Sequence, residues 1–458
     1  MYSESIDIPL ANADELINRY HSHTSAQYGD GVVGGMVFDG PASSNYDLDL
    51  GSYLLNEVYD GLTAWQVNAI AAQNLKNKGG PPGASNILIN GTAVSSSGQG
   101  SYNKVTITKG KKYRLRLTNV AVDSYIRVSL DNHNMTVMTS DFVPINPFTT
   151  QWLLLAIGQR YDVVINANQA SGNYWFRAES QAGCFSSSAG VGQAIWTYAD
   201  ATAGTPSSSA WTEPSGCLEP QMSPYWKQPV PSASFQNTLD TEITNAVVTP
   251  GGDSMVVWAL NKPIWVDYAN PTMQYLMEGN TSYPEAYNVI NTNSEGSWNY
   301  WLITSDPNTF GLDHPIHLHG HDFFVIGQGS GTYDESSANL NWNNPVRRDT
   351  ATLPASGWLA IAFASNNPGA WLMVSGRPVL PVLRLCTDTS SFCSTATSPG
   401  TSAKVSVCNT WSSRIRLCSL TRMRLRRLAT TTSRIRATRI AIRTASTILD
   451  YRLLDIPL

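Results

Sequence analysis

Alternation of apolar and polar residues is the dominant pattern along most of the chain. Residues 113–117 and 125–130 place apolar side chains at every second position, which is the period of a β-strand. Turn-forming clusters, such as the Gly-Gly-Pro-Pro-Gly run at residues 79–83, separate such segments. Short strands with regular turns between them are typical of β-sandwiches. The sequence therefore predicts an all-β fold.

Two turn-rich segments divide this pattern. A Gly-Pro turn at residues 40–41 is followed by polar residues, and residues 211–240 are rich in proline and serine. A chain of 458 residues is long enough for about two to four domains. We predict a short first part, two larger domains and a tail, at residues 1–45, 46–220, 221–375 and 376–458.

Composition narrows the class of protein. Charged residues make up only 14% of the chain and aromatic residues 10%, which favours a folded globular protein over disorder. No apolar run is long enough to cross a bilayer, so we expect no membrane association. The net charge of −4 conceals an asymmetry, because residues 389–449 contain many arginines and no acidic residue.

The most concentrated chemistry lies in residues 313–325. Four of the seven histidines fall there, namely His314, His317, His319 and His321. The flanking residues are aromatic and branched, which indicates a strand, so His317 and His319 share one face while His314 points the other way. Neutral imidazole suits copper, zinc and iron. A chance cluster of surface histidines is the alternative, but this spacing favours two metal centres, one on each side of the strand.

A second histidine pair precedes a distinctive run. His21 and His23 are two residues apart, and Gln-Tyr-Gly-Asp-Gly follows at residues 27–31. A bare His-x-His is often only an exposed polar pair, but with this run it resembles a copper motif of the multicopper oxidases. Residues 313–325 resemble another copper motif of that family. Residues 158–163, 344–350 and 366–373 resemble further segments of its fungal laccases.

The resemblance implies both a fold and a cofactor. It implies cupredoxin-like Greek-key β-sandwich domains, with a partial first, a full second and an incomplete third domain. The basic tail that follows has no counterpart in the family, and its composition predicts disorder. The family uses copper, as one blue copper and a trinuclear cluster. In this sequence His314 would bind the blue copper, and the cluster would be bound by His21, His23, His317 and His319. His133 and His321 would not be ligands.

The chain departs from the family pattern in two places. The family's His-Trp-His-Gly motif has no counterpart before His21, and its His-Cys-His segment is replaced by Val-Ser-Gly after Met373. We interpret the second departure as a deletion or altered splice junction followed by a lost reading frame, which also explains the basic tail. A selected basic arm for nucleic acid or anionic lipid is the alternative for that tail. With five ligand histidines left, a full copper set is not expected.

Other residues receive roles from the same resemblance. Cys184 and Cys217 have the spacing of a family disulfide, which implies an oxidising compartment. Gln151 falls where laccases carry an acidic residue near the substrate pocket, so we expect weaker oxidation of phenols and a flatter pH dependence. Three sequons allow glycosylation, at Asn90, Asn134 and Asn280. We expect secretion by resemblance, although the first residues do not form a signal peptide.

These observations predict a laccase-like oxidase. It would oxidise phenols or aryl amines by one electron and reduce dioxygen to water, as a monomer that binds no nucleic acid. The chain as written would be inactive for lack of ligands. One alternative is a non-catalytic paralogue or a gene-model fragment with a residual copper site. The other is a basic-tailed anion-binding protein on a cupredoxin scaffold.

Overall fold

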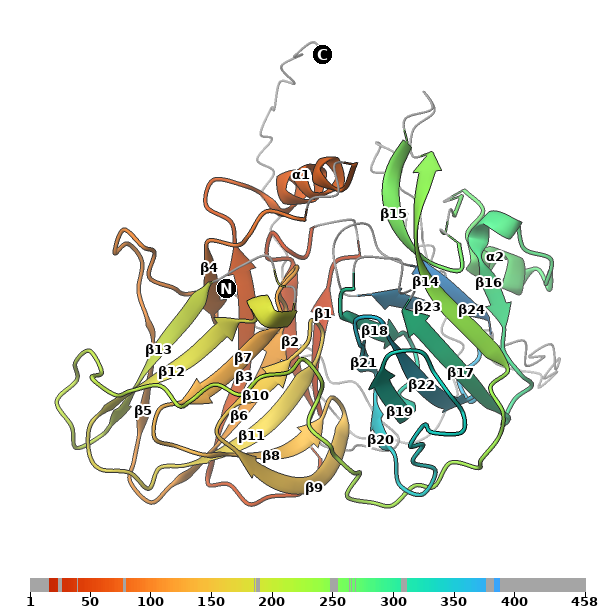
Figure 1. Ribbon diagram of the computed structural model, residues 1–458. Helices are drawn as coiled ribbons and strands as arrows, with labels where there is room; N and C mark the ends of the chain where they lie inside the picture. The colour runs from red at the N-terminus through yellow and green to blue at the C-terminus, as the bar shows by residue number, and fades with distance from the viewer. Residues whose placement is uncertain are drawn as a thin grey trace, which may run out of the picture. The chain divides into compact units, whose positions relative to one another are not determined.

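The computed structural model describes residues 16–23, 27–38, 40–76, 80–184, 186, 190–247, 254–262, 264, 266–267, 269–305, 311–375 and 383–387. Strands dominate these residues (Figure 1), so the all-β prediction is confirmed. Of the predicted tail at residues 376–458, the structure describes only residues 383–387, which form strand β24. No helix in the described part of the chain is long and apolar enough to span a membrane.

The first group of strands forms two sheets, which we call the middle sandwich. One sheet has the order β4-β3-β6-β11-β8-β9 and the other the order β10-β7-β12-β13-β5. Their bounds are β3 Leu48–Val58, β4 Asn86–Ile89, β5 Asn103–Ile107, β6 Lys112–Asn119, β7 Ile126–Leu130, β8 Met135–Ser140, β9 Val143–Thr150, β10 Leu153–Leu155, β11 Arg160–Asn166, β12 Asn173–Ser180 and β13 Val191–Tyr198. The strands predicted from residues 113–117 and 125–130 correspond to β6 and β7.

The middle sandwich has one apolar core between its sheets. Leu55 and Leu115 come from the six-stranded sheet, and Val128, Phe176 and Trp196 come from the other; all five are fully buried. These are the apolar positions of alternating segments, whose polar neighbours point to the opposite face. Burial of apolar surface at roughly 25 cal/mol per Å² is therefore the main force that holds the two sheets together.

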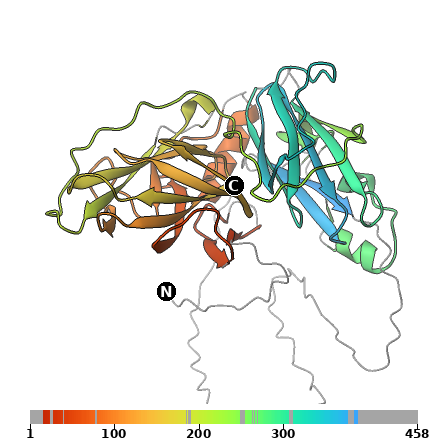
Figure 2. The same cartoon turned by 90° about the horizontal axis from the view of Figure 1, so that it is seen from below.

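The second group of strands, which we call the third sandwich, also forms two sheets (Figure 2). Their orders are β15-β14-β17-β22-β19-β20 and β16-β24-β23-β18-β21. The bounds are β14 Asn237–Val247, β15 Ser254–Leu260, β16 Val289–Asn291, β17 Trp298–Ser305, β18 His314–Leu318, β19 Phe323–Ser330, β20 Val346–Arg348, β21 Thr350–Leu353, β22 Gly357–Ala364, β23 Ala370–Ser375 and β24 Leu383–Thr387. Trp301, Ile316, Leu318, Phe363 and Met373 are buried together in its core.

The N-terminal strands form a separate small sheet. β1 (Leu16–His21) pairs antiparallel with β2 (Val33–Phe38). Arg19 ties this sheet to the middle sandwich, because its Nη1 donates to the carbonyl of Asn119 at 2.8 Å. This contact places His21, at the end of β1, next to residues that lie much later in the chain.

The helices are α1 (Ala64–Lys76), α2 (Thr272–Met277) and the short 3-10 turns Ala182–Cys184 and Glu285–Tyr287. α1 begins with reciprocal capping: the Thr63 N–H donates to Gln66 Oε1 at 2.8 Å, and the Gln66 N–H donates to Thr63 Oγ1 at 3.3 Å. Asp30, from the histidine-pair run, accepts the Ala64 N–H at 2.6 Å. That run therefore also stabilises the start of a helix.

Candidate metal centre

Strand β18 positions the histidines of the later motif. It pairs antiparallel with β21 on one side and with β23 on the other, so its backbone is fixed from both edges. Ile316 and Leu318 point into the apolar core. His317 points to the opposite face because side chains alternate along a strand. The alternation of side chains along β18 therefore determines which histidines lie on the same face.

His319 lies one residue beyond the strand. The sequence predicted it within the strand, but β18 ends at Leu318 and a turn follows. The His319 N–H still donates to the Leu372 carbonyl at 2.8 Å, so the ring stays beside that of His317, with 4.9 Å between ring centroids. Gly320 then adopts a φ of 68°, and a Cβ there would lie 2.4 Å from the Trp371 ring. The tight turn therefore requires glycine.

The hydrogen bonds of His317 select its tautomer. Its Nδ1 lies 2.7 Å from the carbonyl oxygen of Asp349, and a carbonyl can only accept. Nδ1 therefore carries the proton, and Nε2 keeps its lone pair. The Thr350 hydroxyl lies 3.2 Å from the same Nδ1. A metal-binding imidazole is commonly held in this way by a backbone carbonyl.

In the earlier histidine pair, a backbone hydrogen bond likewise selects the tautomer of His21. The His21 Nδ1 donates to the Ser22 carbonyl at 3.1 Å, which again leaves Nε2 as the lone-pair nitrogen. The rings of His21 and His23 lie 4.6 Å apart, and Tyr28 contacts His21 edge-on at 5.7 Å. His23 lies past the end of β1 and is exposed on one side.

The two pairs meet in space. The His23 and His319 ring centroids are 4.8 Å apart, although 296 positions separate the residues (319 − 23). The four rings form a row in the order His21, His23, His319, His317. Among the described residues, the His319 Nε2 is buried and has no hydrogen-bond partner. Within the described residues, no group of three or more His, Cys, Asp or Glu side chains is arranged so that it could hold a metal ion as it stands.

The surroundings lower the pKa values of three of these imidazoles, those of His21, His23 and His319. Burial, together with Arg19 and His23, lowers the pKa of His21 to about 3. Burial, together with His317 and His23, lowers the pKa of His319 to about 3. The pKa of His23 is also lowered, first by burial of the inner side of the ring and then by His317 and Arg19. Neutral imidazole is the form that binds metals.

The opposite face of β18 is different. His314 is buried, and its Nδ1 lies 3.2 Å from the Ser375 hydroxyl on β23. β23 runs Ala-Trp-Leu-Met-Val-Ser and offers no thiol. The donor atom beside His314 is therefore a hydroxyl, where a blue copper needs a soft thiolate ligand.

The remaining histidines have structural surroundings. His133 is buried, with Nδ1 donating to the Asp131 carbonyl at 2.8 Å and Nε2 at 2.9 Å from the Tyr198 hydroxyl. The His321 Nδ1 donates to the His319 carbonyl at 3.2 Å, and its ring lies against Phe363 and Trp371. Neither ring joins the row of four.

The other residues that the sequence singled out lie on the middle sandwich or at the surface. Cys184 and Cys217 are joined by a disulfide, as the resemblance implied. Gln151 is exposed between β9 and β10. The three sequon asparagines, Asn90, Asn134 and Asn280, are exposed as well.

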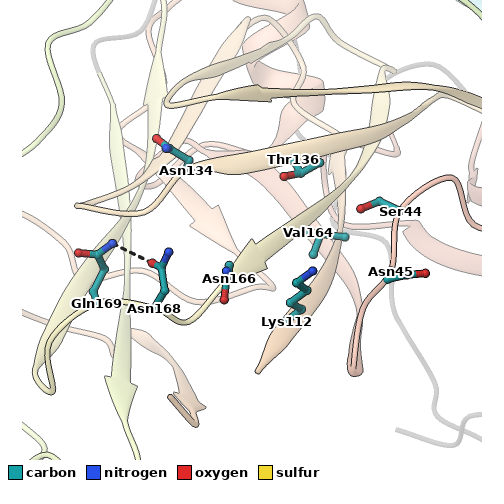
Figure 3. A pocket seen from close by; sticks show the side chains of 9 residues that line it. All are labelled: Ser44, Asn45, Lys112, Asn134, Thr136, Val164, Asn166, Asn168 and Gln169. Atoms are coloured by element: carbon teal, nitrogen blue, oxygen red, sulfur yellow. Dashed lines mark hydrogen bonds between the residues drawn. The ribbon is translucent and has the colours of Figure 1, made fainter. Parts of the chain in front are cut away.

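A polar cavity of about 250 Å³ lies away from these histidines (Figure 3). Asn134 is the one predicted site residue on its wall. The lining residues carry mainly amide and hydroxyl groups, and they are Ser44, Asn45, Lys112, Asn134, Thr136, Val164, Asn166, Asn168 and Gln169. With no histidine on its wall, this cavity is separate from the candidate metal centre.

Sequence reasoning missed the charged residues behind the histidines. Arg160 on β11 and Asp349 before β21 form a buried pair of hydrogen bonds at 2.6 and 2.7 Å. The run Val-Arg-Arg-Asp-Thr at residues 346–350 was visible only as a family-like segment. A charged triplet between two strands was the available signal, but its partner lies on another domain.

Comparisons with known proteins place this chain in a family. Two multicopper oxidase family models match residues 53–201 and 258–375. The chain is 46% identical to Laccase-3 of Botryotinia fuckeliana over 77% of this chain and 80% of that protein. It is 43% identical to Laccase-1 of Melanocarpus albomyces over 77% of this chain and 58% of that protein.

The solved structures agree with this. The crystal structure of the laccase from Botrytis aclada matches with a TM-score of 0.74 at 34% identity, over 82% of this chain and 70% of that one. Fet3p, described as a multicopper oxidase that functions in iron import, matches with a TM-score of 0.71 at 20% identity, which supports the fold alone. The chain therefore has cupredoxin-like domains and belongs to the multicopper oxidase family, whose members are copper-dependent oxidoreductases. Within that family it is laccase-like.

The four-histidine row fits copper by its donor chemistry. It offers four imidazoles, two of them with the proton fixed on Nδ1 and one with an unsatisfied buried Nε2. Imidazole is a suitable copper ligand. The His314 side fits only in part, because one imidazole and a hydroxyl do not make a blue copper site.

Proposed function

We propose that His21, His23, His317 and His319 hold copper between the N-terminal sheet and the third sandwich, as the remnant of a laccase-like oxygen-reducing centre. The meeting of His23 and His319 at 4.8 Å carries this proposal, because it joins two motifs from distant parts of the chain. Copper, when bound, supplies one-electron redox chemistry and the reduction of dioxygen to water. The complete activity would be the one-electron oxidation of phenols or aryl amines.

The chain's own residues prepare this centre. The Asp349 and Ser22 carbonyls hold the protons of His317 and His21 on Nδ1 and orient the rings. The buried Leu318 and the paired neighbours of β18 exclude water from one side. The lowered pKa values of His21, His23 and His319 keep these three imidazoles neutral at physiological pH, so protons compete little with the metal there.

The site at which electrons would enter lacks part of its ligand set. His314 would be the one imidazole of a blue copper site, with Ser375 where the site needs a soft ligand. We propose that the chain as written passes electrons from a phenol poorly or not at all. This favours a non-catalytic paralogue, or a sequence altered after Met373, over a working oxidase.

The remaining assignments follow the family. We propose an extracellular monomer, supported by the disulfide and by three exposed sequons. Gln151 is proposed as a substrate-pocket residue that cannot accept a phenol proton. The domain limits stay as proposed from the sequence, at residues 45, 220 and 375; strand β24 (Leu383–Thr387) lies beyond the last of them.

The test is a Cu(II) titration of the purified chain. Electron paramagnetic resonance and visible absorption would be recorded, and oxygen uptake would be measured with a phenol present. We expect histidine-bound Cu(II), no intense thiolate-to-copper band and no phenol-dependent oxygen uptake. A chain that binds no copper would overturn the metal centre. A full copper complement with rapid oxygen uptake would overturn the incomplete electron entry.

A further inference from the structure

Asp349 connects the middle sandwich to a proposed copper ligand. It lies between β20 and β21, next to the third sandwich's histidine strand. The two terminal nitrogens of Arg160, on β11 of the middle sandwich, donate to its two carboxylate oxygens at 2.6 and 2.7 Å. Both residues are buried, so little water competes for this fork.

The same aspartate holds His317 through its backbone. Its carbonyl accepts the His317 Nδ1–H at 2.7 Å, and its Oδ1 lies 3.5 Å from that nitrogen. The carbonyl also accepts the Leu318 N–H at 3.2 Å and is held by the sheet. Loss of the fork would instead free the carboxylate and move Oδ1, together with the Thr350 hydroxyl that donates to Oδ1 at 2.8 Å and lies 3.2 Å from the same Nδ1. Both carboxylate oxygens of Asp349 accept from one guanidinium, so the fork is a bidentate ion pair.

Arg160 is itself fixed. Its guanidinium lies 4.7 Å from the centroid of the Phe142 ring, and its Nη1 also donates to the Gly158 carbonyl at 3.2 Å. Asp141 lies 3.6 Å away on another side. An arginine held by an aromatic face, a carbonyl and two carboxylates has little freedom to follow a moving partner.

We infer that Arg160 is a positioning residue for His317: by fixing Asp349 across the two sandwiches, it sets the orientation of an imidazole that it does not touch. The copper part of this inference rests on the proposed function, while the orientation of the ring does not. Buried ion pairs are weak contributors to net stability compared with apolar packing, so a geometric role is a sufficient reason for this one.

A second arginine fork provides a matched control. Arg177 on β12 donates from Nε and Nη2 to the two carboxylate oxygens of Asp131 at 2.8 and 3.0 Å. Asp131 is buried, and its carbonyl accepts the His133 Nδ1–H at 2.8 Å, so this fork has the same form within the middle sandwich. Removal of Arg177 therefore tests the loss of an arginine–aspartate fork without loss of the Arg160–Asp349 fork.

The experiment compares Arg160→Met with Arg177→Met in the full chain. The first readout is the His317 Nδ1–H resonance of metal-free, histidine-labelled protein, assigned by its loss in His317→Gln. We expect Arg160→Met to shift or lose this resonance and Arg177→Met to retain it, although each variant loses a bidentate arginine–carboxylate pair. With Cu(II) alone as the probe, we expect Arg160→Met to bind about 10- to 100-fold more weakly, with altered hyperfine splitting.

Two further variants keep the result decisive. Asp349→Asn retains the carbonyl and the shape but loses the fork, and should reproduce the Arg160→Met spectrum. Arg160→Lys keeps the charge and should restore the resonance only in part, which decides the question if Arg160→Met does not fold. An unchanged His317 resonance in Arg160→Met, or an equal change in both arginine variants, would overturn the inference. Failure of the wild-type chain to bind Cu(II) would instead refute the proposed metal centre, since the resonance needs no metal.

Discussion

The two faces of strand β18 carry the same type of ligand in different surroundings. On one face, His317 and His319 meet His21 and His23 from the N-terminal strands. On the other face, His314 lies buried beside the Ser375 hydroxyl. The strand supplies both sides equally well, because alternation sends its side chains in two directions.

This difference shows that a strand carrying ligand residues does not form a metal centre without ligands from other segments. The first face is completed by a segment from the other end of the chain. The second face depends on β23, whose sequence offers a hydroxyl where a soft donor is needed. The following predictions test this contrast, from the largest expected effect to the smallest.

The largest effect should be on stability, and it should come from the core positions between the histidines. Leu318 is fully buried, so Leu318→Ala should lower the free energy of unfolding by about 2–5 kcal/mol. His319→Ala, on a partly exposed neighbour, should lower it by well under half of that. Urea unfolding at neutral pH measures both. Equal losses would mean that the histidine face also carries the fold.

Copper affinity should depend on only one face. His319→Gln should weaken Cu(II) binding by about 100-fold, because it removes the ring that joins the two histidine pairs. Loss of a ligand should weaken binding at least as much as a change in a residue that only supports a ligand. His314→Gln is the control and should change the affinity by less than about threefold. Titration against a competing chelator measures both values. A similar loss in both variants would contradict the separation of the faces.

Acid should destabilise the protein through the first face. The folded-state pKa values of His21 and His319 are about 3, below their ordinary value of 6.5, so the unfolded chain binds more protons between these values. The associated stability is therefore present above pH 6.5 and is lost as the pH falls toward 3.

We expect this loss to be on the order of 1–2 kcal/mol, less than the full shifts imply because solvent screens partly exposed rings. Unfolding curves at a series of pH values would measure it. The double variant His21→Gln/His319→Gln should show a shallower fall between pH 6 and pH 4. An unchanged slope would show that other groups control acid stability.

The smallest effect should be a partial repair of the second face. Ser375 Oγ lies 3.2 Å from the His314 Nδ1, so Ser375→Cys would place a sulfur beside this imidazole. A weak thiolate-to-copper absorption should appear on addition of Cu(II), with an increase in affinity of only a few-fold. Ser365→Cys, also on a buried serine, is the control and should give no such band. Absence of a band in Ser375→Cys would mean that β23 and His314 cannot share a metal.

Much of the site could be predicted from local sequence. The alternation around residues 314–318 correctly separated His314 from His317, because the strand period is a local property. The Cys184–Cys217 pair followed from family resemblance. The turn position of His319 and the helix α1 were not predicted, since each depends on local hydrogen bonds that compete with the strand pattern.

By itself the sequence determined the all-β class, the two faces of the histidine motif and a donor type that suits copper, zinc and iron alike. Only the tertiary structure decided that His23 lies against His319, that Asp30 caps α1, and that Arg160 donates hydrogen bonds to Asp349. The reason is physical: each of these contacts joins segments far apart in the chain. Their meeting is fixed by how the apolar cores pack, and no residue spacing within one segment records it.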